Sequence, residues 1–234
     1  GEKSKEELIN SGINKNNIVV TGPSIYDEII KYKTVKEREN TVALMTSGFY
    51  IYGLTKENTY FNYVKKFLDE ISNLNLKVTI KLHPEEQKFI EKYEKIAKNY
   101  PNVEKITATS NREELYKIMA ESSIIINFGS SISLEAIILD KPVINILGLH
   151  NSQIYDFKIV IDRLKSSKAF VTIDKDDDLK ETIKKLLDNK KIQGDLYKER
   201  KKFIKESCYK IDGKSSERII NLIQNLIAWI NNQN

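Results

Sequence analysis

Short and almost wholly apolar runs alternate along the chain with longer stretches in which apolar residues recur every three or four positions. Continuous Val, Ile and Leu runs are typical of parallel strands buried on both faces, and the longer spacing is typical of amphipathic helices. The pattern predicts strands at Asn17–Thr21, Thr41–Thr46, Lys77–Leu82, Val103–Ile106, Ser123–Asn127, Pro142–Leu147 and Ala169–Ile173. It predicts helices at Glu57–Ser72, Glu85–Lys98, Arg112–Ala120, Ile132–Leu139 and Asp178–Asn189.

The alternation of strands and helices indicates the fold class. Repeated βαβ units build an α/β fold, a doubly wound parallel sheet with helices on both faces. No linker rich in Pro, Gly or Ser interrupts the pattern, so it predicts a single domain over residues 1–234.

The last helical stretch, Ser216–Ile230, has a different pattern. Its apolar residues cover well over half of the helix surface: Ile219, Ile220, Leu222, Ile223, Leu226, Ile227, Trp229 and Ile230. A helix of this kind normally has a partner on more than one side. We therefore expect residues 214–232 to contact a second domain or a subunit. The chain also starts without Met, and we expect it to be a piece of a longer protein.

Composition narrows the class of protein only slightly. The net charge of +5 is a mild bias and not the footprint of a nucleic-acid binder. A single cysteine, Cys208, excludes an intrachain disulfide and reads as an inert thiol. No run is apolar enough for a membrane span and none resembles a signal peptide, so a soluble cytoplasmic protein is expected.

Chemically useful residues follow several predicted strands directly. In open α/β sheets, ligands bind outside the carboxyl ends of the strands, near the switch in strand order. The segments at that edge are Ser47–Tyr50, His83–Glu85, Phe128–Ser131 and Gly148–Asn151. Both histidines of the chain, His83 and His150, fall on this edge, so it is the predicted ligand site.

The turn at Gly129–Ser131 is the strongest candidate for binding an anion. A buried strand ends before it and a helix with Ser130, Ser131 and Ser133 at its start follows, which is where phosphate binds well. The alternative is an ordinary turn with a Ser cap. Glu135 lies one helical turn after Ser131 and could accept hydrogen bonds from ribose hydroxyls. Its alternative is a solvent-facing helix residue.

His83 and Ser47–Gly48 are the other candidates. Pro84 marks a helix start, so His83 could donate to a phosphate oxygen or act as a general acid there. Its alternative is a structural cap. His150 is a weaker candidate, and Ser47–Gly48 could supply a second set of backbone donors.

Several common sites are excluded. The chain has no P-loop, no GxGxxG and no GxSxG motif, and one Cys with two distant His cannot form a zinc pattern. The acids Asp174, Asp176, Asp177 and Asp178 lack the spacing of a calcium loop and are expected to cap a helix. We expect no metal site and no tightly bound cofactor.

The chain resembles the carboxyl-terminal, donor-binding half of GT-B fold enzymes of surface-carbohydrate synthesis. The resemblance rests on GEKSKEELINSGINKNNIVVTGPSIYDEI at the start, KLHP and FGSS with Glu135 downstream, and IDGKSSERI near the end. It spans nearly the whole chain. The most similar groups are CDP-glycerol glycerophosphotransferases, capsule-type sialyl- and polysialyltransferases, and UDP-N-acetylglucosamine 2-epimerases.

The resemblance implies roles for the candidate residues. His83, Ser130 and Ser131 would bind the donor phosphate, Glu135 would hold the ribose, and Asp212–Gly213 would be structural. Residues 1–22 would lead in from a missing amino-terminal domain that holds the acceptor and the catalytic base, and residues 214–232 would return to it. The epimerases carry a Gly pair in this turn and a second acid after the Glu. Here the turn has one Gly, and Ala136 follows Glu135, which favours cytidine-nucleotide donors.

Three hypotheses follow. The first is the donor-nucleotide domain of a glycosyl- or glycerophosphate-transferase for surface polymers. It uses a CDP-, CMP- or UDP-linked donor as substrate and a polysaccharide or lipid-linked acceptor, with peripheral association with the inner face of the membrane left open. The second is half of a UDP-N-acetylglucosamine 2-epimerase. The third is a non-catalytic α/β interaction module whose last helix is the partner surface.

Overall fold

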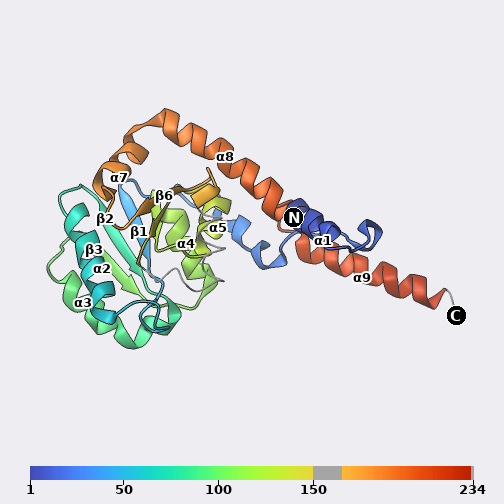
Figure 1. Cartoon of the computed structure of the whole chain (residues 1–234), viewed down its shortest axis with the longest axis horizontal. Coiled ribbons are helices and arrows are strands. Elements are labelled where there is room, and N and C mark those ends of the chain that lie inside the picture. Colours follow the sequence, from blue (N-terminus) through green and yellow to red (C-terminus); the bar gives the residue numbers. More distant parts are fainter. Residues whose placement is uncertain (150–164, 233–234) are drawn as a thin grey trace.

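The computed structural model describes residues 1–149 and 165–232, and its centre is one open, parallel, six-stranded sheet (Figure 1). The strand order is β3-β2-β1-β4-β5-β6. The strands are β1 (Thr41–Met45), β2 (Lys77–Lys81), β3 (Val103–Thr107), β4 (Ile124–Asn127), β5 (Val143–Leu147) and β6 (Val171–Asp174). This is the α/β, doubly wound fold class that the sequence predicts.

Helices connect and cover the strands. The α-helices are α1 (Glu2–Asn10), α2 (Glu57–Ile71), α3 (Ile90–Ala97), α4 (Arg112–Glu121), α5 (Ile132–Ile138), α7 (Leu179–Asp188), α8 (Lys190–Cys208) and α9 (Ser215–Asn231). Short 3₁₀ helices are η1 (Lys15–Asn17), η2 (Ser24–Tyr26), η3 (Ile29–Tyr32) and η4 (Pro84–Phe89). Within the described ranges, no helix is both long enough and apolar enough to cross a bilayer.

Alternate residues of the strands face two separate cores. Val42 and Leu44 of β1 pack on the face that α2 and α7 cover, whereas Ala43 and Met45 pack on the face that α4 and α5 cover. Because both faces are covered, β1 is apolar at nearly every position, as expected for a parallel sheet. The helix pattern of α2 is also confirmed, since Val64, Phe67, Leu68 and Ile71 are all buried.

The predicted strand at Asn17–Thr21 is wrong. Residues 15–17 form η1, which the Asn14 side chain caps by accepting from the Asn16 N–H at 2.9 Å. The following residues join no strand, and the Thr21 carbonyl accepts instead from Arg218 Nε at 2.7 Å. This segment therefore contacts α9 through a backbone carbonyl and is not part of the sheet.

The helical pattern missed one long helix and merged two short ones. α8 is strongly basic, contains Gly194, and buries only Arg200 and Cys208, so its apolar stripe is weak. The predicted helix at Glu85–Lys98 is divided into η4 and α3, with the boundary at Phe89 and Ile90. The other predicted strands and helices are confirmed, with ends shifted by one or two residues.

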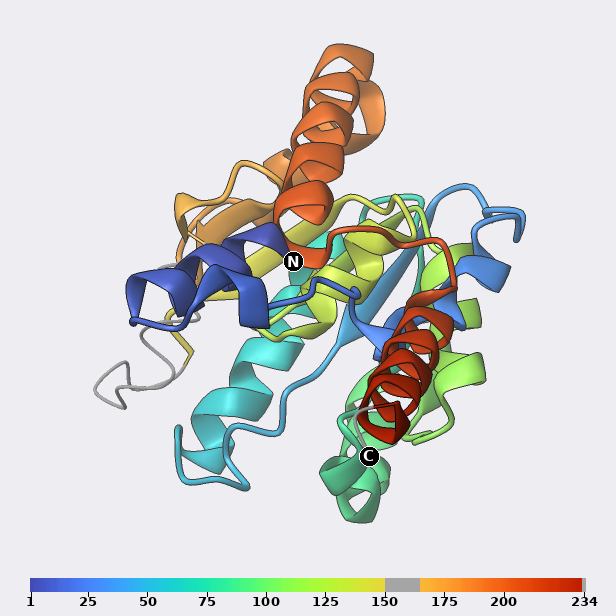
Figure 2. The same cartoon turned by 90° about the vertical axis from the view of Figure 1, so that its right-hand side faces the viewer.

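α9 extends away from the sheet (Figure 1), and Figure 2 views it nearly end-on. Only Ser215 of α9 is buried. Its large apolar side chains Ile220, Ile223, Leu226, Ile227, Trp229 and Ile230 are 49–62% exposed. The expected partner of this helix therefore stays a prediction.

Candidate functional site

The candidate residues converge where the order of the strands reverses. Going outward from the centre of the sheet, β1 is followed by β2 on one side and by β4 on the other. Ser47 follows β1, His83 follows β2, and Gly129 follows β4. Neighbouring strands lie about 4.8 Å apart, so these three segments share one edge across the switch point, where open α/β sheets bind ligands.

A buried carboxylate fixes the backbone of His83. The side chain of Glu86 is fully buried. Its Oε2 accepts from the Thr46 hydroxyl and, at 3.0 Å, from the His83 N–H. Its Oε1 accepts from the Tyr93 hydroxyl. Glu86 therefore ties the ends of β1 and β2 to each other and positions His83 at the edge.

The imidazole of His83 has one nitrogen occupied and one available. Nδ1 accepts from the Glu85 N–H at 3.3 Å, which is a capping contact at the start of η4. When the ring is neutral, the proton is therefore on Nε2, which can act as a donor. The Tyr52 ring stands edge-on to the imidazole, with 6.0 Å between centroids. Capping and ligand binding are compatible because they use different nitrogens.

A hydrogen-bonded network shapes the turn after β4. Asn127 Oδ1 accepts from the Ser130 N–H at 2.8 Å, which closes the turn around Gly129. Asn127 Nδ2 donates to the Ser133 hydroxyl at 3.0 Å, and that hydroxyl lies 2.6 Å from Asn145 Oδ1. Ser133 therefore works inside the network. Ser131 is exposed at the start of α5, and no hydrogen bond of its side chain occurs within the described residues.

The buried polar groups near this edge that have no partner among the described residues include the Ser47 hydroxyl and Asn145 Nδ2. Their residues are 8% and 0% exposed. Buried polar groups are normally hydrogen-bonded, so both groups are explained if a ligand or water completes them. The Ser47 N–H, in contrast, is occupied, because it donates to the Tyr60 hydroxyl at 3.2 Å.

Gly48 follows Ser47 at a position where the backbone conformation and close packing favour glycine. Its φ is +60°, and a Cβ there would lie 3.2 Å from Glu86 Cγ. The turn after β1 can therefore pack closely over the carboxylate that positions His83.

Glu135 is a half-buried carboxyl on α5. Burial raises its pKa above the ordinary value of 4.5, and the Arg112 guanidinium partly opposes this shift. Two tyrosines share this environment: burial and the nearby Glu135 raise the pKa of Tyr26 to about 12 and also raise that of Tyr116. The position is not that of a solvent-facing helix residue, which excludes the simplest alternative.

The raised pKa of Glu135 gives a stability prediction. A carboxyl with a raised pKa in the folded state stabilises the fold when protonated and loses that contribution as pH rises through the folded pKa. Glu135→Gln is therefore expected to raise the free energy of unfolding at pH 7 relative to the unmodified protein. The gain should shrink as pH falls through the folded pKa toward 4.5 and be absent below that value. Urea unfolding at pH 7 and pH 4 measures this, with the exposed Glu85→Gln as control. A loss of stability at pH 7 would contradict it.

Among the described residues, no group of three or more His, Cys, Asp or Glu could hold a metal ion. Of the acidic cluster, Asp178 caps α7 by accepting from the Glu181 N–H at 2.8 Å, whereas Asp177 accepts from the Asp174 N–H at 2.7 Å, outside that helix. His150 lies outside the described residues.

Sequence reasoning missed several residues of this edge. Glu86 lies unremarked inside the predicted helix at Glu85–Lys98, although an acid three residues after a capping residue is the signal of a capping box. Asn127 and Asn145 pair across β4 and β5, and a polar residue inside a buried apolar strand was the available signal. Arg112 and Tyr52 carried no signal in the sequence.

The architecture is that of a Rossmann-like domain of the GT-B type. The family model described as UDP-N-acetylglucosamine 2-epimerase matches residues 1–224, so the chain belongs to this family. The expected preference against the epimerases, drawn from the single Gly of the turn, is therefore not supported. A comparison with curated proteins gives no match.

Solved structures agree with this fold at low sequence identity. UDP-GlcNAc 2-epimerase from Methanocaldococcus jannaschii, in complex with UDP-GlcNAc and UDP, is 17% identical with a TM-score of 0.61, and the match covers 96% of this chain and 59% of that one. The Neisseria meningitidis enzyme bound to UDP-GlcNAc is 15% identical with a TM-score of 0.59, covering 95% and 60%. The wall teichoic acid polymerase TagF is 14% identical with a TM-score of 0.52, covering 92% and 53%.

The chain spans less than two thirds of the length of the epimerase structures that it matches, from 56% to 60%. Family and neighbours are enzymes, and the matched epimerase structures include complexes with UDP and UDP-GlcNAc.

Proposed function

We propose that this chain is the nucleotide-sugar-binding half of an enzyme that acts on a UDP-linked sugar, with UDP-N-acetylglucosamine as the substrate. The observation that carries this proposal is the family match over residues 1–224. The polar ends of β1, β2 and β4 at the switch point support it, because that edge is where this fold class binds nucleotides.

In this proposal the diphosphate lies between the turn after β4 and His83. The hydroxyls of Ser130 and Ser131 and the Ser131 N–H would face one phosphate, and His83 Nε2 would donate to the other. Ser47 and Gly48 line the edge between them. The buried Ser47 hydroxyl that lacks a partner supports a polar ligand at this point. Glu135 would accept hydrogen bonds from the ribose hydroxyls.

Such donors would assist departure of the nucleotide. When the bond between the sugar and the diphosphate breaks, negative charge grows on the phosphate oxygens. Donors that are already aimed at those oxygens stabilise this charge without reorganising. Glu86 accepts from the His83 N–H and Asn127 Oδ1 accepts from the Ser130 N–H, so both residues are held in fixed positions before the substrate arrives, which is the condition for that effect. His83 is therefore the proposed catalytic residue.

We also propose that further catalytic groups come from a second domain that faces the same edge. The exposed apolar side of α9 supports this, since six large apolar side chains there are about half exposed or more. Burying such residues is worth roughly 1.5–3 kcal/mol each. On this proposal, residues 1–22 lead in from that domain, residues 214–232 return to it, and this chain alone binds the nucleotide without turnover.

A transferase that uses a CDP- or CMP-linked donor is the second candidate. The observation that favours it is the turn itself, with a Ser pair after one Gly and the buried Ala136 in place of a second acid after Glu135. A polysaccharide or lipid-linked acceptor would then bind through the second domain. The likeness to the teichoic acid polymerase concerns the fold alone.

The two candidates differ in the base of the nucleotide. Titration calorimetry of the 234-residue chain with UDP, UDP-N-acetylglucosamine, CDP and CMP should give the tightest binding for the uridine nucleotides. His83→Ala should weaken UDP binding about 10- to 100-fold, the loss of one hydrogen bond to a charged group. Ser131→Ala should weaken it less.

The control is Glu85→Ala, an exposed neighbour whose side chain lies outside the proposed contacts. Tighter binding of CDP or CMP would favour the transferase. Binding of no nucleotide would leave the interaction module as the better description. Equal UDP affinity in His83→Ala and Glu85→Ala would remove His83 from the site.

A further inference from the structure

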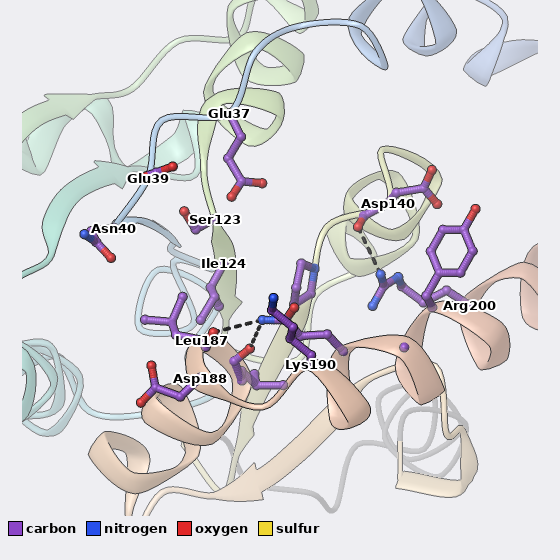
Figure 3. Close-up of a pocket in the computed structure, with 15 residues that line it drawn as sticks. Glu37, Glu39, Asn40, Ser123, Ile124, Asp140, Leu187, Asp188, Lys190 and Arg200 are labelled. Atoms are coloured by element: carbon purple, nitrogen blue, oxygen red, sulfur yellow. Dashed lines mark hydrogen bonds between the residues drawn. The ribbon is translucent and has the colours of Figure 1, made fainter.

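A second hollow lies on the opposite edge of the sheet. It is an open pocket of about 700 Å³ at the amino ends of β1, β4 and β5, where Asn40, Ser123 and Pro142 line it. The junction of α7 and α8 forms another wall (Figure 3). Since the proposed nucleotide edge is at the carboxyl ends of the same strands, this amino-edge pocket is a separate place on the molecule.

A buried arginine that forms no ion pair among the described residues lines this pocket. Arg200 of α8 is only 4% exposed. Its Nη2 donates to the Asp140 carbonyl at 3.1 Å, whereas Nε and Nη1 have no partner among the described residues. The Asp140 carboxylate is engaged elsewhere, 3.0 Å from Lys201 Nζ. Figure 3 shows the guanidinium beside Asp140 at the wall of the pocket.

A guanidinium in this position calls for an anion. Arginine stays protonated in proteins, and a buried charge is costly unless it is paired and hydrogen-bonded. Within the part of the chain that the structure describes, Arg200 forms no ion pair with a carboxylate. A carboxylate or phosphate can bind a guanidinium through two parallel hydrogen bonds to adjacent N–H groups, and an anion that uses Nη1 and the second N–H of Nη2 would satisfy the unpartnered Nη1.

Gly194 is an independent observation from the same wall. It lies inside α8 and lines the pocket, and a Cβ built on it meets no atom within 4 Å. Gly destabilises a helix interior relative to Ala, and no neighbouring protein atom explains it here. The lack of a side chain keeps the helix backbone open to the pocket, which fits a ligand that lies against it.

The charges around the pocket define the class of ligand. Glu37 is paired with Lys141 at 2.7 Å and Asp140 with Lys201. Among the described lining residues, the charges without an ion pair are two cations, Arg200 and Lys190, and two acids, Glu39 and Asp188. Their charges sum to zero. Balanced charge disfavours a multiply charged phosphate and suits one carboxylate at Arg200.

The opposite wall supplies acceptors. Glu39 and Asp188 lie across the pocket from Arg200 (Figure 3), and the aliphatic side chains of Ile124 and Leu187 also line it. Carboxylates accept hydrogen bonds from ammonium and hydroxyl groups. We propose that the amino-edge pocket binds a small carboxylate through Arg200, with ammonium or hydroxyl donors at its far end facing Glu39 and Asp188, and with Gly194 giving it room.

The test is a titration of the 234-residue chain with L-serine, β-alanine and gluconate, and with acetate and inorganic phosphate for comparison. The readout is the Nε–H signal of Arg200 and the amide signal of Gly194 in ¹H–¹⁵N NMR spectra. At least one of the first three probes should saturate both signals. The resulting affinity should fall at least tenfold in Gly194→Ala and be lost in Arg200→Met.

Gly194→Ala separates a ligand role from a structural one. On helix propensity it should raise Tm by about 2–4 °C, so weaker binding cannot come from a damaged fold. Lys202→Ala is the control for the charge of α8, because Lys202 is exposed and lies outside the pocket. UDP affinity should be the same in all three variants.

The proposal fails if no carboxylate moves the two signals, or if Gly194→Ala binds as tightly as the unmodified chain. Saturation by inorganic phosphate alone would overturn the carboxylate class. Because UDP binding is measured beside it on the other edge, failure here is distinguishable from failure of the proposed nucleotide site.

Discussion

Replacing Glu86 by alanine is expected to lower the free energy of unfolding by about 3–5 kcal/mol. The substitution removes the shared acceptor of the Thr46 hydroxyl, the His83 N–H and the Tyr93 hydroxyl. Each buried donor left without a partner costs about 1–3 kcal/mol, and the site would also contain a cavity. Urea unfolding with a matched thermal scan measures the change.

Lys81 increases the expected loss. Burial lowers the pKa of Lys81, and the negative charge of Glu86 acts in the opposite direction. Without that charge, Lys81 is a buried ammonium held mainly by the Leu82 carbonyl at 2.8 Å. The Glu86→Ala protein should therefore show a Lys81 pKa that falls further below its ordinary value.

Two matched variants separate the causes. Glu86→Gln keeps the shape of the side chain and one acceptor oxygen. Its free energy of unfolding should therefore lie between those of the unmodified protein and of Glu86→Ala. Glu85→Ala removes a neighbouring acid that is exposed, and its effect should stay within about 0.5 kcal/mol. If Glu86→Ala and Glu85→Ala were equally stable, the buried network would not support the fold. Glu86→Gln should also weaken UDP binding if Glu86 positions His83.

The sequence carried enough information to predict the sheet, but not the contacts that organise its edge. Val42 to Met45 could be assigned because a strand buried on both faces must be apolar throughout. His83 and Ser130 could be placed because they directly follow such strands. The role of Glu86 could not be predicted, because it depends on contacts with Thr46 and Tyr93, which are 40 and 7 residues away in the sequence.

Tertiary contacts also explain the errors at the two ends of the chain. The residues after Asn17 have the β-branched composition of a strand, yet the Thr21 carbonyl is bound by Arg218, 197 residues later. The sequence pattern did not predict α8, because the helix is rich in lysine and contains Gly194, so its apolar periodicity is weak. The local sequence pattern indicates which elements a segment can form, and its tertiary contacts decide which of them it adopts.

Replacing Asp27 by alanine is expected to release the first turn of α9. The Asp27 carboxylate accepts from the Ser215 N–H at 2.9 Å and from the Ser216 N–H at 2.7 Å, so it caps a helix 188 residues away. Hydrogen bonds to a charged group contribute about 1.5–3 kcal/mol each. A loss of about 3 kcal/mol in the local opening free energy corresponds to amide exchange roughly 100-fold faster in this turn.

Hydrogen–deuterium exchange resolved along the chain measures this release, with Glu28→Ala as the control, because Glu28 is an exposed acid nearby whose carboxylate pairs with Lys31. Exchange in β1 and β4 should be unchanged, since neither strand touches the cap. Equal exchange of α9 in Asp27→Ala and Glu28→Ala would mean that Arg218, which binds Asp212 at 2.8 Å, holds the helix alone.

The same contact predicts how α9 responds to acid. Burial alone would raise the pKa of Asp27, but the hydrogen bonds from Ser216 and Ser215 outweigh it and hold the pKa below the ordinary value of 3.8. A carboxyl with a lowered pKa stabilises the folded form above its unfolded pKa, and the contribution disappears as pH falls through the folded pKa. Protection of α9, corrected for intrinsic exchange, should therefore stay constant from pH 7 to pH 5 and fall only below 3.8. In Asp27→Asn this acid dependence should disappear, because the amide carries no charge to lose.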